Sequence, residues 1–259
     1  MKRRKKIALP DGSSVYREID LRKKLNLGFL RYANLTHAIG ERDLPALICN
    51  TDVLPDYIAL SGYPAQFHKT PFTAVGFWEY DEDFDGYEGL FNAIYFDRKD
   101  LLAHYRERFA GVKILFTPDC SQFGDVNPIE NDYRLFKARI VGIWLAVELN
   151  AVVIPFITAS TVASARLALT GLENCSVVAF STKGYVNDPV ERAALKNLVR
   201  LTVDTLDLKT IVVYDVCSTK DAVNDIFSYA TEIGITVVVP ANALKERNIA
   251  KRRERHAER

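Results

Sequence analysis

Short apolar runs alternate with helix-length segments along the last two-thirds of the chain, and this alternation limits the possible folds most strongly. The runs are rich in β-branched and aromatic residues, and the strands that they predict lie at 92–96, 112–117, 152–157, 176–181, 210–215 and 235–239. Most are apolar on both faces, which is typical of strands that helices cover on both sides. The pattern predicts an α/β protein in which repeated βα units form a largely parallel sheet.

The segments between these strands carry helix signals. Residues 131–150 place their large apolar side chains on one stripe, which predicts an amphipathic helix. Asp188 is suited to cap a helix and Pro189 to occupy its first turn, so a second helix is predicted from there to about Leu206. Helices in these places allow the right-handed crossovers that join parallel strands.

The first third of the chain is less regular. We expect a short helix near 18–25, an isolated strand at 46–49 and an irregular loop over 54–71. A strand at 74–79 is expected to pair with the strand at 92–96 across an acidic turn, as a hairpin at one edge of the sheet. Because helices are missing between these first strands, we favour an open mixed sheet flanked by helices. The alternative is an incomplete or irregular (β/α) barrel.

Length and composition favour one main core. The chain has 259 residues, 48% of them hydrophobic and 26% charged, which is usual for a single globular domain. We predict a basic, partly helical N-terminal extension at 1–45, one α/β domain at 46–242 and a basic C-terminal helix or tail at 243–259. No stretch approaches the roughly 20 apolar residues of a membrane span. The cysteines show no CxxC spacing, so a cytoplasmic protein without a membrane partner is expected.

Polar residues follow several of the predicted strands. Ligands of parallel α/β proteins bind beyond the carboxyl ends of the strands, so these positions are candidates for a site. Asp119 and Asp215 are the catalytic candidates, because two carboxylates that face one crevice can hold a cation or move a proton. Helix capping or a turn explains either of them singly. The candidate ligand-binding residues are Ser121, Thr158, Ser181, Thr182 and Lys183.

The sequence disfavours several kinds of site. The sequence lacks the phosphate-binding motifs GxxxxGK[ST] and GxGxxG, so these two nucleotide-binding loops are disfavoured. It also lacks the zinc-hydrolase motif HExxH and the serine-hydrolase motif GxSxG. No metal ligands are predicted, and the cofactor is left open. Ser181 to Gly184 is interpreted either as a small anion-binding turn or as a solvated lysine before a turn glycine. Asp81 to Gly86 matches the opening of a calcium loop, but Asn92 stands where that loop needs a glutamate. We interpret this segment as a solvated acidic hairpin tip.

Both ends of the chain are basic, although the formal net charge is only +1. The C-terminal run from Lys245 to Arg259 has helical composition and no apolar stripe, so a solvated helix or tail is the simplest interpretation. Clustered arginines and lysines could instead contact the phosphates of a nucleic acid. Nucleic acid is therefore the alternative partner to a small-molecule or phosphate-bearing ligand.

A series of short motifs resembles a known family. The motifs are Phe116-Thr117-Pro118-Asp119-Cys120-Ser121, the helix with Tyr133, Arg134, Phe136, Lys137 and Arg139, Val153-Ile154-Pro155, Val177 to Gly184, and Val212-Val213-Tyr214. In this order they resemble the uncharacterised domain of unknown function family 4417. The resemblance implies a cytoplasmic protein of bacteria, their phages or mobile elements, and it implies no particular activity. Asp119 and Ser121 match the family pattern, whereas a glycine often stands where this chain has Asp215.

Two classes of function follow from these observations. The first is an enzyme or small-ligand binder with a polar pocket at the carboxyl ends of the strands, bordered by Asp119, Ser121, Thr158 and Thr182, with Lys183 near its mouth. The alternative is a nucleic-acid- or protein-binding accessory factor of a phage or mobile element. We favour the first, because its residues converge through the logic of the fold.

Overall fold

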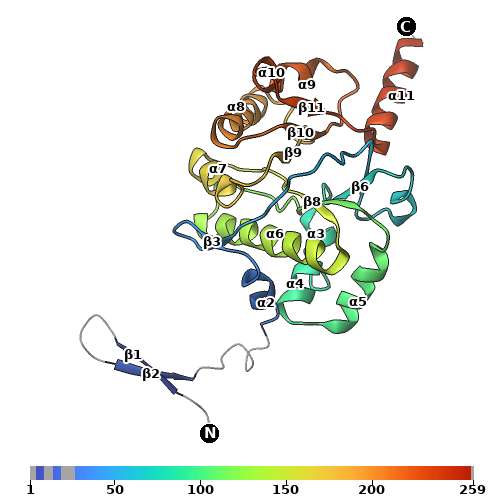
Figure 1. Ribbon diagram of the computed structural model, residues 1–259. Helices are drawn as coiled ribbons and strands as arrows, with labels where there is room; N and C mark the ends of the chain where they lie inside the picture. Colours follow the sequence, from blue (N-terminus) through green and yellow to red (C-terminus); the bar gives the residue numbers. More distant parts are fainter. Residues whose placement is uncertain (1–3, 9–13, 19–26, 258–259) are drawn as a thin grey trace.

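Two parallel sheets form the centre of the molecule (Figure 1). The computed structural model describes residues 4–8, 14–18 and 27–257, and the side chains of residues 27–255. The first sheet has the order β5-β6-β7-β8, from β5 (Tyr57–Leu60), β6 (Thr73–Gly76), β7 (Ile114–Phe116) and β8 (Val152–Ile154). The second has the order β11-β10-β9, from β9 (Val177–Ser181), β10 (Thr210–Tyr214) and β11 (Thr236–Val238). All neighbouring strands within these sheets are parallel, so the predicted fold class is confirmed.

Two short antiparallel pairs precede the first parallel strand. They are β1 (Arg4–Ala8) with β2 (Ser14–Glu18), and β3 (Ala38–Ile39) with β4 (Leu44–Pro45). The helix expected at 18–25 falls outside the described residues, apart from Glu18 at the end of β2. The described part of the N-terminal region does contain one short helix, α2 (Phe29–Ala33).

Helices lie on the outer sides of the two sheets. The 3-10 helix η1 (Pro64–Gln66) and the helices α3 (Asp81–Phe84), α4 (Leu90–Tyr95), α5 (Lys99–Arg108) and α6 (Pro128–Leu149) belong to the part of the chain that contains the first sheet. The later helices are α7 (Val162–Leu169), α8 (Pro189–Thr205), α9 (Asp221–Ile226), α10 (Ser228–Glu232) and α11 (Ala243–Ala257). Figure 1 shows α8, α9 and α10 beside the second sheet and α4, α5 and α6 beside the first, at the opposite side of the molecule. Among the described helices, none is long and apolar enough to cross a membrane.

The strongest helix prediction is confirmed in detail. The Asp188 side chain accepts hydrogen bonds from the amides of Val190 and Glu191, at 2.7 and 3.4 Å, and Pro189 opens α8. The cap satisfies amides that have no partner inside the helix, and the acidic side chain also suits the positive end of the helix dipole.

The strands at 152–157 and 176–181 do not share one continuous sheet, although the sequence favours this. A single parallel bridge joins Phe156 to Ala179. Pro155, which faces β9 at this junction, lacks the N–H that would extend the ladder. Cys49 pairs with the start of β9 instead: its carbonyl accepts hydrogen bonds from the amides of Ser176 and Val177, at 3.0 and 3.3 Å. The predicted strand at 46–49 is therefore reduced to an isolated bridge, in which Cys49 pairs with Cys175 just before β9.

The other edges of the two sheets also meet through one bridge. Tyr57 of β5 bridges Ala241, three residues after β11. Because the ladders are interrupted at both junctions, the described strands form no closed barrel. All the strands of both sheets nevertheless run in one direction, so their carboxyl ends lie on the same side of the molecule.

The hairpin predicted from 74–79 and 92–96 is wrong. Residues 73–76 do form β6, but 90–95 form the helix α4. Leu90, Phe91, Ala93 and Ile94 are all buried, which is the spacing of one helical face. The predicted loop at 54–71 also contains β5, whose four residues lie between Pro55 and Gly62.

Candidate functional site

Asp119 lies beyond the carboxyl end of β7. The position of the chain there is set by Thr117, whose amide donates to the Ile154 carbonyl at 3.1 Å and whose hydroxyl accepts from the Phe156 amide at 2.8 Å. These contacts tie the exit of β7 to β8. The Asp119 side chain emerges at the common end of the parallel strands, where ligands of such folds bind.

The carboxyl group of Asp119 has an unusual environment. Asp119 is half-buried, and its pKa is raised to about 7. Burial is the main cause, the negative charge of Asp81 adds to it, and the positive charge of Lys183 opposes it. Within the described part of the chain, the carboxyl group makes no hydrogen bond. It is therefore able to exchange a proton near neutral pH and to contact a bound molecule.

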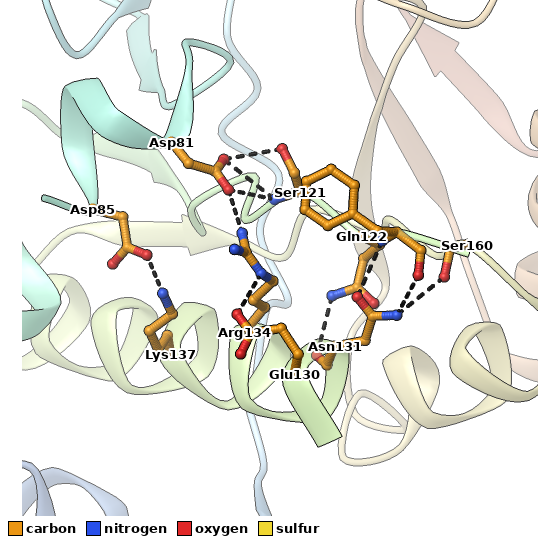
Figure 2. A network of polar contacts seen from close by, with 10 residues as sticks. Asp81, Asp85, Ser121, Gln122, Glu130, Asn131, Arg134, Lys137 and Ser160 are labelled. Atoms are coloured by element: carbon orange, nitrogen blue, oxygen red, sulfur yellow. Dashed lines mark hydrogen bonds and ion pairs between the residues drawn. The ribbon is translucent and has the colours of Figure 1, made fainter. Parts of the chain in front are cut away.

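Asp81, at the start of α3, holds the loop after β7 at Ser121, two residues beyond Asp119; Figure 2 shows the contact with Ser121. It accepts from the Ser121 hydroxyl at 3.0 Å and from the Ser121 amide at 3.3 Å. It also pairs with Arg134 of α6, which reaches Glu130 at 2.9 Å as well. Ser121 is therefore engaged with Asp81, and the solvated acidic tip predicted here is wrong for Asp81.

Asp85 is the second acidic residue that turns inward. It forms an ion pair with Lys137 of α6, and the two side chains are only 12% and 10% exposed (Figure 2). Burial raises the pKa of Asp85, while the hydrogen bond and the charge of Lys137 lower it. This pair and the Asp81–Arg134 pair join α3 and its C-cap residue to α6, since Arg134 and Lys137 lie one turn apart on the same face.

The loop after Asp119 is also fixed to α6. The Asn131 side chain donates to the Phe123 carbonyl at 2.7 Å and accepts from the Phe123 amide at 3.1 Å. Gln122 donates to the backbone carbonyl of Asn131 at 3.2 Å. Asn131 also reaches the Ser160 hydroxyl, at 3.4 Å, as Figure 2 shows. The loop after β7 is thus held against α6 and the loop after β8.

The loop after β9 brings three further polar groups to this end. Lys183 donates a hydrogen bond to the Trp78 carbonyl at 2.6 Å, and its positive charge lowers the pKa of Asp119. Ser181 is buried, and its hydroxyl accepts from the Lys183 amide at 3.0 Å, which shapes the turn. Burial raises the pKa of Tyr185, and both Thr158 and the charge of Asp119 influence it, so Tyr185 lies close to these two residues. Thr158 is thus linked to the surroundings of Asp119 through Tyr185.

Thr182 and Asp215 belong to a separate cluster. The Thr182 hydroxyl donates to the Asp215 carboxylate at 2.9 Å, and the Cys217 amide donates to the same oxygen at 3.0 Å. The other oxygen pairs with Lys245 of α11 at 2.6 Å. Asp215 is 0% exposed, and protein groups bond to both of its carboxylate oxygens. This arrangement suits a structural role in which Asp215 anchors α11 through Lys245. The charges that act on Asp119 are those of Asp81 and Lys183.

Part of this arrangement is visible in the sequence. The positions of Asp119, Ser121 and Lys183 after strands mark them as site candidates, whereas no sequence pattern marks Asp81, Arg134 and Tyr185 as their neighbours. Asp81 carried a misleading signal, because neighbouring acidic residues are usually solvated. Across the residues with described side chains, no group of three or more His, Cys, Asp and Glu residues is placed to hold a metal ion.

The raised pKa of Asp119 predicts how stability changes with pH. The folded protein keeps a proton up to about pH 7 that the unfolded chain releases near pH 4, so the free energy of unfolding falls across this interval and levels off above it. Asp119→Asn does not titrate, so it should be more stable than the wild type by about 4 kcal/mol at pH 8, but nearly equal to it in stability at pH 4. Urea unfolding at both pH values measures the difference. Equal differences at the two pH values would contradict an elevated pKa.

Comparison with known proteins agrees with the motifs noted in the sequence. No curated protein and no solved structure matches the chain significantly. A family described as Domain of unknown function (DUF4417) matches residues 42–230. The match includes β5 to β10 and all the residues of the Asp119 surroundings, and it ends before α11. Since the match covers well over half of the chain, the protein belongs to the DUF4417 family.

Proposed function

We propose that the carboxyl ends of β7, β8 and β9 form a small-molecule site in which Asp119 exchanges a proton with the ligand. The observation that carries this proposal is the state of the Asp119 carboxyl group. It is half-buried, its pKa is raised to about 7, and no described group hydrogen-bonds to it. Raised carboxyl pKa values of this kind are typical of general acids and bases.

The neighbours of Asp119 suit this role. Lys183 brings a positive charge that stabilises the carboxylate formed when the proton leaves. Tyr185 offers a hydroxyl group near the same carboxyl group, whose charge influences the pKa of that hydroxyl. Such a set of one acid and several donors suits a ligand with hydroxyl or carbonyl groups. We therefore favour an enzyme or binding protein for a polar metabolite, in the cytoplasm of a bacterium or of a cell infected by its phage.

Asp119→Asn tests the proposal, because it removes the titrating group without changing its volume. A panel of hydroxy acids, keto acids, sugars and nucleosides is screened by thermal shift with the wild-type protein at pH 7. Compounds that stabilise the wild type should fail to stabilise the variant. If turnover of one of them is found, Asp119→Asn should reduce kcat by about 10²–10⁴-fold, as loss of a general acid or base does.

Asp83→Asn is the matched control. Asp83 is an exposed carboxylate on α3, two residues from Asp81, and replacing it should change neither ligand binding nor turnover. A purely structural role of Asp119 gives another result. Asp119→Asn would then lose roughly 1 kcal/mol or more of stability at pH 6, and any activity would follow the folded fraction. That outcome would rule out the site.

A further inference from the structure

A polar groove of about 700 Å³ lies between α11 and the loops that follow β9 and β10. This volume is within the range of small-molecule sites, roughly 300–1,000 Å³. The groove uses none of the residues that surround Asp119. The polar residues that matter for its chemistry are Asn187, Ser218, Thr219, Lys251, Arg252 and Arg255.

One face of α11 is fixed toward this groove. Lys245 pairs with the buried Asp215 at 2.6 Å, and Asn248 donates to the Val216 carbonyl at 2.7 Å. Arg252 and Arg255 follow Asn248 at helical spacing, so they lie on the same face one and two turns further along. The anchored first half of α11 therefore determines which side chains of its second half line the groove.

No described carboxylate neutralises the positive charge of the groove. Lys251, Arg252 and Arg255 line it, and no carboxylate is found among the described residues that do so. In the described ranges, none of these three side chains takes part in an ion pair. Elsewhere many surface cations are paired, as Arg192 and Lys196 are with Asp225. A concave site with three clustered cations attracts and concentrates anions.

We propose that this groove binds the phosphate group of a phosphorylated small molecule. The guanidinium groups of Arg252 and Arg255 supply paired N–H donors that match phosphate oxygens, and Lys251 adds a third positive charge. The hydroxyl groups of Ser218 and Thr219 and the amide of Asn187 line the same space and donate to the remaining polar atoms of the ligand. The proposal is independent of the function assigned to Asp119, because the two sites share no residue.

Calorimetric titration with inorganic pyrophosphate tests the groove directly. The full-length wild type should bind it saturably with one site per chain. Arg252→Ala and Arg255→Ala should each weaken the affinity about 10- to 100-fold, as loss of a charge-assisted hydrogen bond does. Arg252→Lys keeps the positive charge but loses the paired N–H donors of the guanidinium group. Its affinity for pyrophosphate should therefore lie between those of the wild type and Arg252→Ala.

Arg253→Ala is the matched control, since Arg253 is on the same helix but does not line the groove. It removes the same charge and should change the affinity less than threefold. Equal losses for Arg252→Ala and Arg253→Ala would overturn the proposal in favour of diffuse attraction, as would the absence of saturable binding. A 20-base-pair DNA duplex is titrated in parallel. If DNA binds while pyrophosphate does not, α11 contacts nucleic acid and the small-molecule proposal is wrong.

Discussion

Lys245→Ala should lower the free energy of unfolding by about 3–5 kcal/mol, because it leaves the buried carboxylate of Asp215 without its cation. The Asp215 side chain is 0% exposed and the Lys245 side chain 16% exposed, so the pair is largely shielded from solvent. Thr182 and the Cys217 amide remain on one oxygen, but the other loses its donor. Urea-induced unfolding of the variant and the wild type measures the difference.

Two further variants separate the ion pair from general effects on α11. Arg253→Ala removes an exposed charge from the same helix and should change stability by less than about 0.5 kcal/mol. The double variant Asp215→Asn/Lys245→Met removes both charges, and it should recover most of the loss, since a buried pair can often be replaced by neutral groups. A loss below about 1 kcal/mol for Lys245→Ala would contradict the buried-pair interpretation.

The Asp215–Lys245 pair also shows why the two carboxylates predicted as one site belong to different clusters. Each follows a strand, and the sequence places both at the same edge. Their partners come from distant segments: Asp81 and Lys183 act on Asp119, while Lys245 reaches Asp215. The position of a residue just after a strand predicts at which edge of the sheet it lies. It does not predict the direction in which its side chain points.

The part of the fold from β7 to β11 could be predicted because its strands are apolar on both faces and are separated by helix-length segments. The region before β7 could not be predicted as well. β5 has four residues next to Pro55, and α4 has six residues rich in aromatic and branched side chains. Elements this short contain too few residues to show a period of 2.0 or 3.6. Their burial against the rest of the protein determines their structure.

The division into two sheets also depends on contacts that the sequence pattern does not reveal. Pro155 is visible in the sequence, and a proline inside a strand signals an interrupted ladder. The insertion of Cys49 next to β9 is a contact between segments more than 120 residues apart, since Ser176 donates to its carbonyl. Hydrophobic periodicity carries no information on such pairing.

Trp78→Ala should have a similarly large effect, because Trp78 packs between the two sheets. It follows β6, is 1% exposed, and stacks on Tyr214 of β10 with ring centroids 4.5 Å apart and an interplanar angle of 4°. It also contacts Phe116 and Phe156, at 4.7 and 5.4 Å between centroids. A Cβ atom at Gly76 would lie only 2.1 Å from this ring, so the indole packs directly against the glycine backbone.

We expect Trp78→Ala to lower the free energy of unfolding by about 3–5 kcal/mol, the usual result of removing a buried aromatic side chain. Trp78→Phe keeps part of the ring and should lose about half as much. Among the described residues the indole N–H of Trp78 has no hydrogen-bond partner, so the loss reflects packing alone. A double-mutant cycle with Tyr214→Ala should give a coupling energy of about 0.5–1.5 kcal/mol for the stacked pair. Additive losses in that cycle would show that the stack does not join the two sheets energetically.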